Sequence, residues 1–173
     1  MAAASPANSD MAYGFKPYGP LGQTGPLDVL VGYGTRIFQQ DLVSAGSGGG
    51  VEASAANDTI VIIGSALTGS AASTAGTISA TMDVDQLYQA QEDSVSSTLA
   101  LADRFTTADH IAGAGSATTG LSAHEIDSDT ADASGNNSIS IIDLLDRGDN
   151  LVGDQAEWVC RIVGHLQTSL VGV

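Results

Sequence analysis

In the segment QAEWVCRIVGH, residues 155–165, the residues Ala156, Trp158, Cys160 and Ile162 are spaced two apart. Successive side chains of a β-strand point to opposite faces of the sheet, so residues with this spacing share one face. Large apolar side chains of this kind are usually buried. We therefore predict a β-strand whose Trp158, Cys160 and Ile162 side chains lie in the protein core.

Other segments carry a strand signal as well. They are short runs rich in β-branched residues, bounded by Gly, Asn or Asp: LDVLVGYG (27–34), TIVIIGSAL (59–67), ISATMDV (78–84) and ISIIDLL (139–145). The segment 94–105 has helical spacing of apolar residues and is compatible with one short helix. Because no helical periodicity alternates with the strands, a parallel α/β sheet is disfavoured. We predict an all-β fold, a small antiparallel β-barrel or jelly-roll-like sandwich with an extended N-terminal arm and at most one short helix.

Residues 1–25 contain proline and glycine at a density that favours extended or turn conformations. We therefore divide the chain into an extended N-terminal arm, residues 1–25, and a β-rich domain, residues 26–173. Tyr13, Phe15 and Tyr18 are apolar anchors that a solvated tail would not need, so we expect the arm to contact a partner outside its own domain.

Stretches of Gly, Ser, Thr and Ala predict irregular structure between the strands. Residues 45–58 are expected to form a flexible loop and residues 68–77 a connector. Residues 113–138 are expected to form a long exposed excursion with at most one short strand.

The chain has 173 residues and a formal net charge of -15, from 20 acidic and five basic residues. It therefore lacks the basic stripe that displaces counterions from nucleic acid, and we expect no nucleic-acid partner. No stretch of the sequence has the 18 consecutive apolar residues of a membrane span, so we expect no membrane partner. The bias toward small residues predicts a thin core, which favours stabilisation by association with neighbouring molecules. A β protein that is merely rich in loops would have the same composition.

Motifs that carry chemistry are weak in this sequence. His110, His124 and His165 lack the spacing of a helical zinc pair, and we expect them at the surface or rim. Residues 127–137 contain three aspartates but not the ligand pattern of an EF-hand loop. The glycine-rich residues 113–120 lack the Lys-Ser/Thr of a phosphate loop. We therefore predict no enzymatic activity, no cofactor and no metal.

Several phrases of the sequence follow one another in a recognisable order: GFKPYGPLGQTG (14–25), IFQQDLV (37–43), YQAQED (88–93), GAGSATTGLSAHEIDSDTA (113–131) and LLDRGDNLVGDQAEWVCRIVGH (144–165). Together they resemble a family of tailed-bacteriophage virion proteins, the head structural or decoration (cement) proteins. The resemblance implies a protein of the outer capsid surface that binds the major capsid protein and stabilises contacts between capsid subunits. It also implies a homo-oligomer, a trimer, because such proteins commonly sit on threefold positions. A tail or baseplate structural protein is one alternative. An enzyme such as a glycan hydrolase of the virion is the other, and it would need paired carboxylates across a cleft.

The last phrase contains the tripeptide Arg147-Gly148-Asp149, which adhesion receptors read in other proteins. The sequence departs from the family pattern at Gly148, where many relatives carry proline. In the family pattern Arg147, Asp149 and Asn150 are structural turn residues between the last two strands. Asp and Asn favour turns because they bond their own backbone. A surface adhesin that uses the tripeptide is the competing interpretation.

Overall fold

The computed structural model describes residues 8–29, 34, 36–56, 62–72, 76–133 and 137–167. Over these residues the chain forms eleven β-strands and a single 3₁₀ helix, η1 (Leu101–Asp103). The all-β prediction is therefore confirmed, including its allowance of at most one short helix. Every strand ladder is antiparallel, as expected.

The largest sheet has six strands in the order β1-β7-β11-β10-β8-β9. A parallel bridge between Glu92 and Ile126 joins the edge strand β9 to the end of β7, so the sheet curls back on itself. The bounds of these strands are β1 (Lys16–Tyr18), β7 (Leu87–Gln91), β8 (Thr107–Gly113), β9 (Ala123–Asp132), β10 (Ile139–Leu144) and β11 (Glu157–Ile162).

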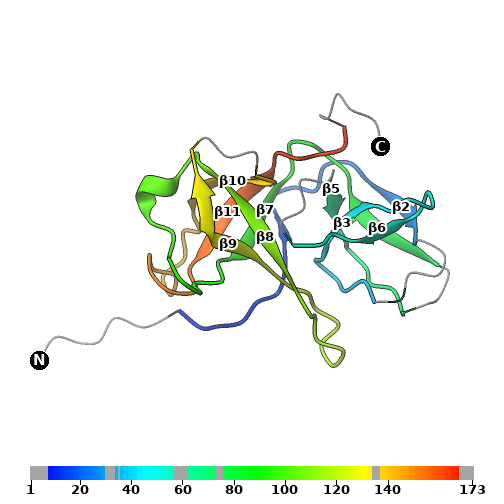
Figure 1. Ribbon diagram of the computed structural model, residues 1–173, viewed down its shortest axis with the longest axis horizontal. Helices are drawn as coiled ribbons and strands as arrows, with labels where there is room; N and C mark the ends of the chain where they lie inside the picture. Colours follow the sequence, from blue (N-terminus) through cyan, green and yellow to red (C-terminus); the bar gives the residue numbers. More distant parts are fainter. Residues whose placement is uncertain are drawn as a thin grey trace, which may run out of the picture.

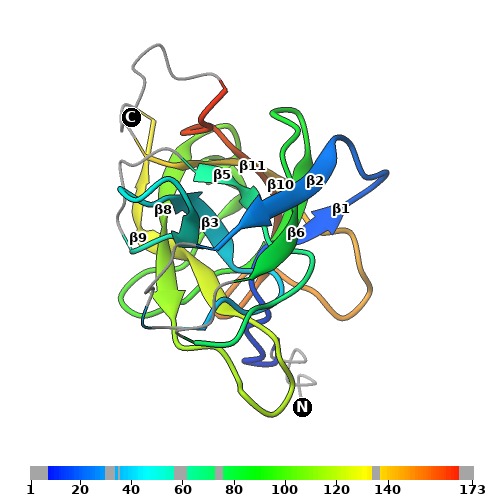
Figure 2. The same cartoon turned by 90° about the vertical axis from the view of Figure 1, so that its right-hand side faces the viewer.

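Two smaller sheets lie beside the large one, on the right in Figure 1. One pairs β2 (Thr24–Asp28) with β6 (Thr77–Thr81). The other has the order β4-β3-β5, with β4 (Val51–Ala53), β3 (Leu42–Ala45) and β5 (Ile62–Ser65). Figure 2, which looks at this end, shows β2 and β6 in front of β3 and β5.

The sheet β4-β3-β5 separates two hydrophobic cores. Leu42 of β3 and Ile62 of β5 belong to the large core, which lines the six-stranded sheet. The next residues, Val43 and Ile63, belong to a smaller core that also contains apolar side chains of β6. Both faces of β3 and β5 are therefore buried, and this explains why each strand has large apolar residues at two adjacent positions.

The large core does not have the thin composition expected from the abundance of small residues. Trp158, Tyr88 and Phe15 are its largest members, and each is at most 1% exposed. Cys160 and Ile162 are buried beside Trp158, on the face that the two-residue spacing assigns to the core. Small residues such as Ala90, Ala108 and Ala156 are buried in the same core, so small and large side chains fill it together.

The boundary placed at residue 25 is also wrong, because residues 14–25 belong to the folded domain. Phe15 is fully buried in the large core, β1 pairs with β7, and β2 pairs with β6. Proline did not prevent strand formation here, since β1 is an edge strand and the missing N–H group of Pro17 costs no essential ladder bond. Residues 1–7 of the expected arm lie outside the described residues.

Two expected loops contain strands, and two expected strands are only partly described. The stretch 113–138 contains the ten-residue strand β9, in which His124, Ile126 and Ser128 alternate inward. The expected flexible loop at 45–58 contains β4, which pairs with β3. Parts of the expected strands 27–34 and 59–67 lie outside the described residues. Of the described parts, residues 27–28 belong to β2 and residues 62–65 to β5.

Candidate functional site

The three aromatic residues assigned to the arm have different environments. Phe15 is fully buried, so it anchors residues 14–18 to their own domain and is not available to a partner. Tyr13 is half-buried and donates a 2.5 Å hydrogen bond from its hydroxyl to Glu157 Oε2. Tyr18 is 41% exposed and is therefore the one of the three whose ring reaches solvent most freely.

Residues 8–13 lie against the domain through polar contacts. The side-chain amide of Asn8 donates to Leu151 O at 2.7 Å and its oxygen accepts from Leu151 N at 3.0 Å. The amide of Gln91 likewise donates to Ser9 O at 2.7 Å and accepts from Met11 N at 3.0 Å. Met11 itself is 71% exposed. This segment is therefore held by hydrogen bonds and not by burial of large apolar side chains.

The predicted turn residues form a connected network between β10 and β11. Arg147 donates to both carboxylate oxygens of Glu157, at 2.6 and 3.2 Å. Asn150 is buried; its amide donates to Leu145 O and Glu157 O at 2.8 Å each, and its oxygen accepts from Glu157 N at 2.9 Å. A charge-assisted fork and a fully bonded amide give this turn a fixed shape.

The tripeptide Arg147-Gly148-Asp149 has the geometry of this structural turn. Arg147 Nε donates to Asp149 Oδ1 at 2.5 Å, so the two charged side chains bind one another while Arg147 also binds Glu157. A receptor that reads both charges would have to separate this pair and compete with Glu157. The geometry therefore favours the structural interpretation of the tripeptide over the adhesive one.

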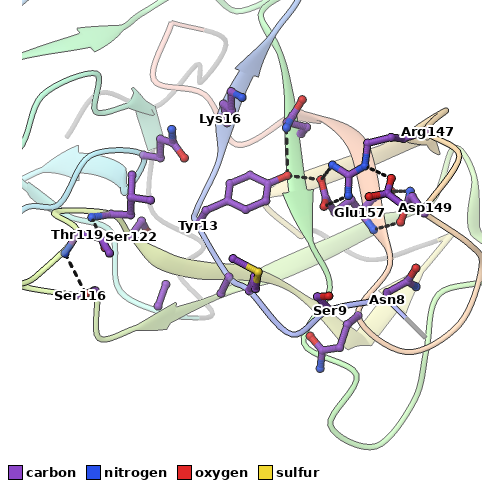
Figure 3. A pocket seen from close by; sticks show the side chains of 18 of the residues that line it. Asn8, Ser9, Tyr13, Lys16, Ser116, Thr119, Ser122, Arg147, Asp149 and Glu157 are labelled. Atoms are coloured by element: carbon purple, nitrogen blue, oxygen red, sulfur yellow. Dashed lines mark hydrogen bonds and ion pairs between the residues drawn. The ribbon is translucent and has the colours of Figure 1, made fainter. Parts of the chain in front are cut away.

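A groove of about 870 Å³ runs between the N-terminal segment, the β8–β9 connection and this turn. In Figure 3, Tyr13 lies across the middle of the groove, with Ser116, Thr119 and Ser122 on one side and Arg147, Asp149 and Glu157 on the other. The polar side chains that line its right half in the figure already bond one another. In this structure these side chains attach the chain's own N-terminal segment, through the bond between Tyr13 and Glu157.

The histidines were expected at the surface or rim, and that expectation is wrong. His110, His124 and His165 are each at most 2% exposed. The ring of His124 stacks on that of His110 with centroids 5.6 Å apart, and Phe15 meets His110 edge-on. The rings of His110 and His124 fill this part of the core like aromatic side chains, and burial lowers the pKa of His124 to about 3.

His124 and Asp41 are buried next to a serine, but their arrangement differs from that of a hydrolase triad. His124 Nδ1 accepts a 3.3 Å bond from Leu42 N, and Nε2 faces Asp41 Oδ1 at 3.5 Å. Both ring nitrogens are therefore occupied, whereas a triad needs one of them to take the serine proton. Burial raises the pKa of Asp41 to about 6, an effect of desolvation that its hydrogen bonds to Ser122 and Phe38 N only partly offset.

Five of the eight exposed large apolar side chains among the described residues lie at one end of the molecule. This end is built from the β7–β8 loop (residues 92–106) and the β10–β11 turn (residues 145–156), and we call it the apolar end. Gln155 N donates to Ser94 Oγ at 2.6 Å, which joins the two segments. Figure 1 shows both on the left, opposite β2 and β6. The exposed fractions are 74% for Val95, 49% for Leu101, 78% for Phe105, 39% for Leu151 and 44% for Val152.

Phe105 combines this exposure with an unusual backbone. Its φ is +68°, in the left-handed region that bulky residues rarely adopt and that costs on the order of 1–3 kcal/mol. The conformation is fixed by a 2.7 Å bond from Phe105 N to Ile141 O and a 3.0 Å bond from Ile141 N to Thr106 O. No sequence pattern marks such a residue, because its distinguishing properties are its backbone angle and its exposure.

Two further findings concern metal ligands and membrane spans in the described part of the chain. Within the ranges that the structure describes, no group of three or more His, Cys, Asp or Glu side chains is arranged to hold a metal ion. The helical content of those ranges includes nothing long and apolar enough to cross a membrane. A comparison of the chain with protein-family models, curated proteins and solved structures found no match.

Proposed function

We propose that this protein is a capsid decoration (cement) protein of a tailed bacteriophage, which binds the outer surface of the head and stabilises contacts between major capsid subunits. The observation that carries the proposal is the apolar end. A chain with 20 acidic residues and only five basic ones leaves five large apolar side chains exposed on two adjoining segments. Exposed apolar groups gathered in this way are typical of a surface that a partner covers.

The net charge of -15 supports a location on the outside of the head. A strongly acidic protein is repelled by packaged DNA, and its charge keeps it soluble at high concentration before it binds the head. Attachment then depends on apolar contact together with basic groups of the partner. Many copies that each add a modest contact would together hinder the separation of capsid subunits.

We further propose that the protein is a homotrimer on the shell. The described core contains the large side chains Trp158, Tyr88 and Phe15, so a thin core gives no reason for association. The remaining motive is the family resemblance and the closed symmetry of such assemblies. Mass measurement in solution and on decorated heads tests this proposal directly.

The experiment for the function uses the purified protein and heads assembled from the cognate major capsid protein. Saturable co-sedimentation with heads, and added density on their outer surface in cryo-electron microscopy, is the expected result. The decorated heads should also survive higher temperature than undecorated ones. Density on the tail and none on the head would transfer the protein to the tail or baseplate class.

A further inference from the structure

We propose that Phe105 is the anchor of the apolar end, and that it inserts into an apolar recess of a major capsid subunit that is flanked by basic side chains. This inference rests on the proposed function and adds to it the residue and the chemistry of the contact. Phe105 has the highest exposed fraction of the large apolar residues described, at 78%.

The backbone around Phe105 is held in place by hydrogen bonds. Asp103 Oδ2 accepts from Ala100 N at 2.8 Å, and Thr106 donates to Asp103 O from both its N–H, at 3.1 Å, and its hydroxyl, at 2.6 Å. Leu99, at the start of this turn, is 1% exposed and sits in the large core. The ring is therefore displayed on a pre-ordered turn, and less freedom is lost when a partner binds it.

The left-handed conformation of Phe105 is informative because glycine or asparagine would adopt it at lower cost. A phenylalanine at such a position, with its ring in solvent, lowers the stability of the isolated protein. Strained residues that persist in this way are commonly part of a binding site. Aromatic side chains are also the residues that most often dominate the binding energy of an interface.

The charge around the anchor indicates what kind of surface it meets. Asp143, whose side chain is 57% exposed, and Asp103 lie next to it, and Arg104 offsets only part of their charge through a 3.4 Å ion pair with Asp143. A second copy of this chain, with 20 acidic and only five basic residues in all, offers few basic groups for such a contact. Complementarity therefore favours a partner surface with basic groups around an apolar recess, and we assign that surface to the capsid subunit.

The test compares Phe105→Asn and Phe105→Gly with the wild-type protein. Both substitutions suit the left-handed backbone, so the melting temperature should equal or exceed that of the wild type. Affinity for heads, measured by co-sedimentation, should fall on the order of 30-fold, as for a hot-spot aromatic. The matched control is Leu21→Ala, which removes a side chain with 56% exposure before β2 and should leave affinity unchanged.

The outcomes separate the two proposals. If the wild-type protein does not bind heads, the proposed function fails. If the wild type binds and both Phe105 variants bind equally well, the anchor is wrong although the function stands. A variant that binds normally to heads but loses self-association would assign Phe105 to a contact between copies and would also overturn the inference.

Discussion

At the scale of single residues, Glu92 shows how burial of a charged group affects stability. Its side chain is fully buried beside Trp158, and its Oε2 accepts a 2.5 Å bond from Leu99 N. Desolvation raises its pKa from 4.5 to about 7, and its hydrogen bonds only partly oppose this. The unfolded chain ionises more readily than the folded protein, so the contribution of Glu92 to stability falls as pH rises from about 4.5 to 7.

The variant Glu92→Gln removes this ionisation while it keeps an oxygen that can accept from Leu99 N. We expect it to be more stable than the wild type at pH 8, by about 1–3 kcal/mol, with little difference at pH 4.5. Urea unfolding at the two pH values measures the effect. Asp154→Asn, at an exposed carboxylate, is the control and should change stability by the same small amount at both pH values. An equal effect of Glu92→Gln at both values would contradict the assignment.

Arg147 and Asp149 belong to the same tripeptide but should differ in importance. Arg147→Ala leaves Glu157, whose side chain is 10% exposed, without its fork of two bonds. Losing the partner of a nearly buried carboxylate costs about 1–3 kcal/mol. Asp149→Glu keeps the charge on a side chain that is 73% exposed, and should change stability by less than about 0.5 kcal/mol.

Chemical unfolding of the two variants tests this ranking, and infection assays test the adhesive alternative. Asp149→Glu should abolish receptor recognition of the tripeptide. Because we assign the tripeptide a structural role, we expect virions that carry this variant to adsorb normally. Lost adsorption together with unchanged stability of Arg147→Ala would favour the adhesin interpretation.

At the scale of elements, the N-terminal residues divide at Gly14. Residues 8–13 are attached by hydrogen bonds, whereas Phe15 and β1 are part of the large core and the six-stranded sheet. Gly14 has φ +83° and no room for a side chain, since a Cβ atom there would approach Gln40 O within 2.3 Å. The bonded segment and the buried segment therefore meet at a residue that must be glycine.

Deletions on either side of Gly14 should have unequal effects. Removal of residues 1–12 should leave the fold intact and lower the free energy of unfolding by no more than about 2 kcal/mol. The hydrogen bonds of residues 8–12 are lost, but the entropy cost of holding these residues in place is lost with them. Removal of residues 1–20 also deletes Phe15, and a buried phenylalanine alone contributes about 3–5 kcal/mol. Circular dichroism melts of both truncations measure this contrast. A fold that survives loss of residues 1–20 unchanged would show that Phe15 is not a core residue.

The elements also show which parts of the fold were predictable from sequence. Strands β6, β10 and β11 were found because apolar residues occur at every second position or in short β-branched runs. Residues 113–138 were expected to hold at most one short strand, and the length and burial of β9 exceed this. Two of its inward positions are His124 and Ser128, whose burial depends on tertiary partners. Among site residues, the turn at Arg147 and Asn150 could be predicted because residues 144–165 resemble the family pattern. The left-handed backbone and exposed ring of Phe105 could not be predicted from the sequence.

At the scale of the whole molecule, buried ionisable groups set the pH of greatest stability. Burial raises the pKa of Asp41 to about 6 and, with nearby carboxylates, that of Glu125 to about 7, in addition to Glu92. Each of these carboxyls binds a proton more tightly in the folded protein. Stability therefore declines as pH rises from about 4 to 7 through their folded pKa values.

The histidines have the opposite effect. Burial lowers the pKa of His124 from 6.5 to about 3 and also lowers that of His165. The unfolded chain takes up protons on these rings below pH 6.5 while the folded protein excludes them, so stability declines as pH falls from 6.5 toward 3. Below about pH 4 the unfolded carboxyls also become protonated, and nothing then offsets the cost of the histidines.

These opposing groups place the stability maximum near pH 5, more acidic than is usual for a protein whose carboxylates are paired. We expect the free energy of unfolding to fall by on the order of 2 kcal/mol between pH 5 and 8, and to fall again below pH 4. Self-repulsion of the -15 charge adds to the loss at pH 8, so 0.5 M salt should recover part of it. Urea unfolding across pH 3.5–8 at two salt concentrations measures the profile. A maximum at or above pH 7 would mean that the carboxyls at Asp41, Glu92 and Glu125 are ionised in the folded protein at little cost, and that bound partners or water stabilise their charge.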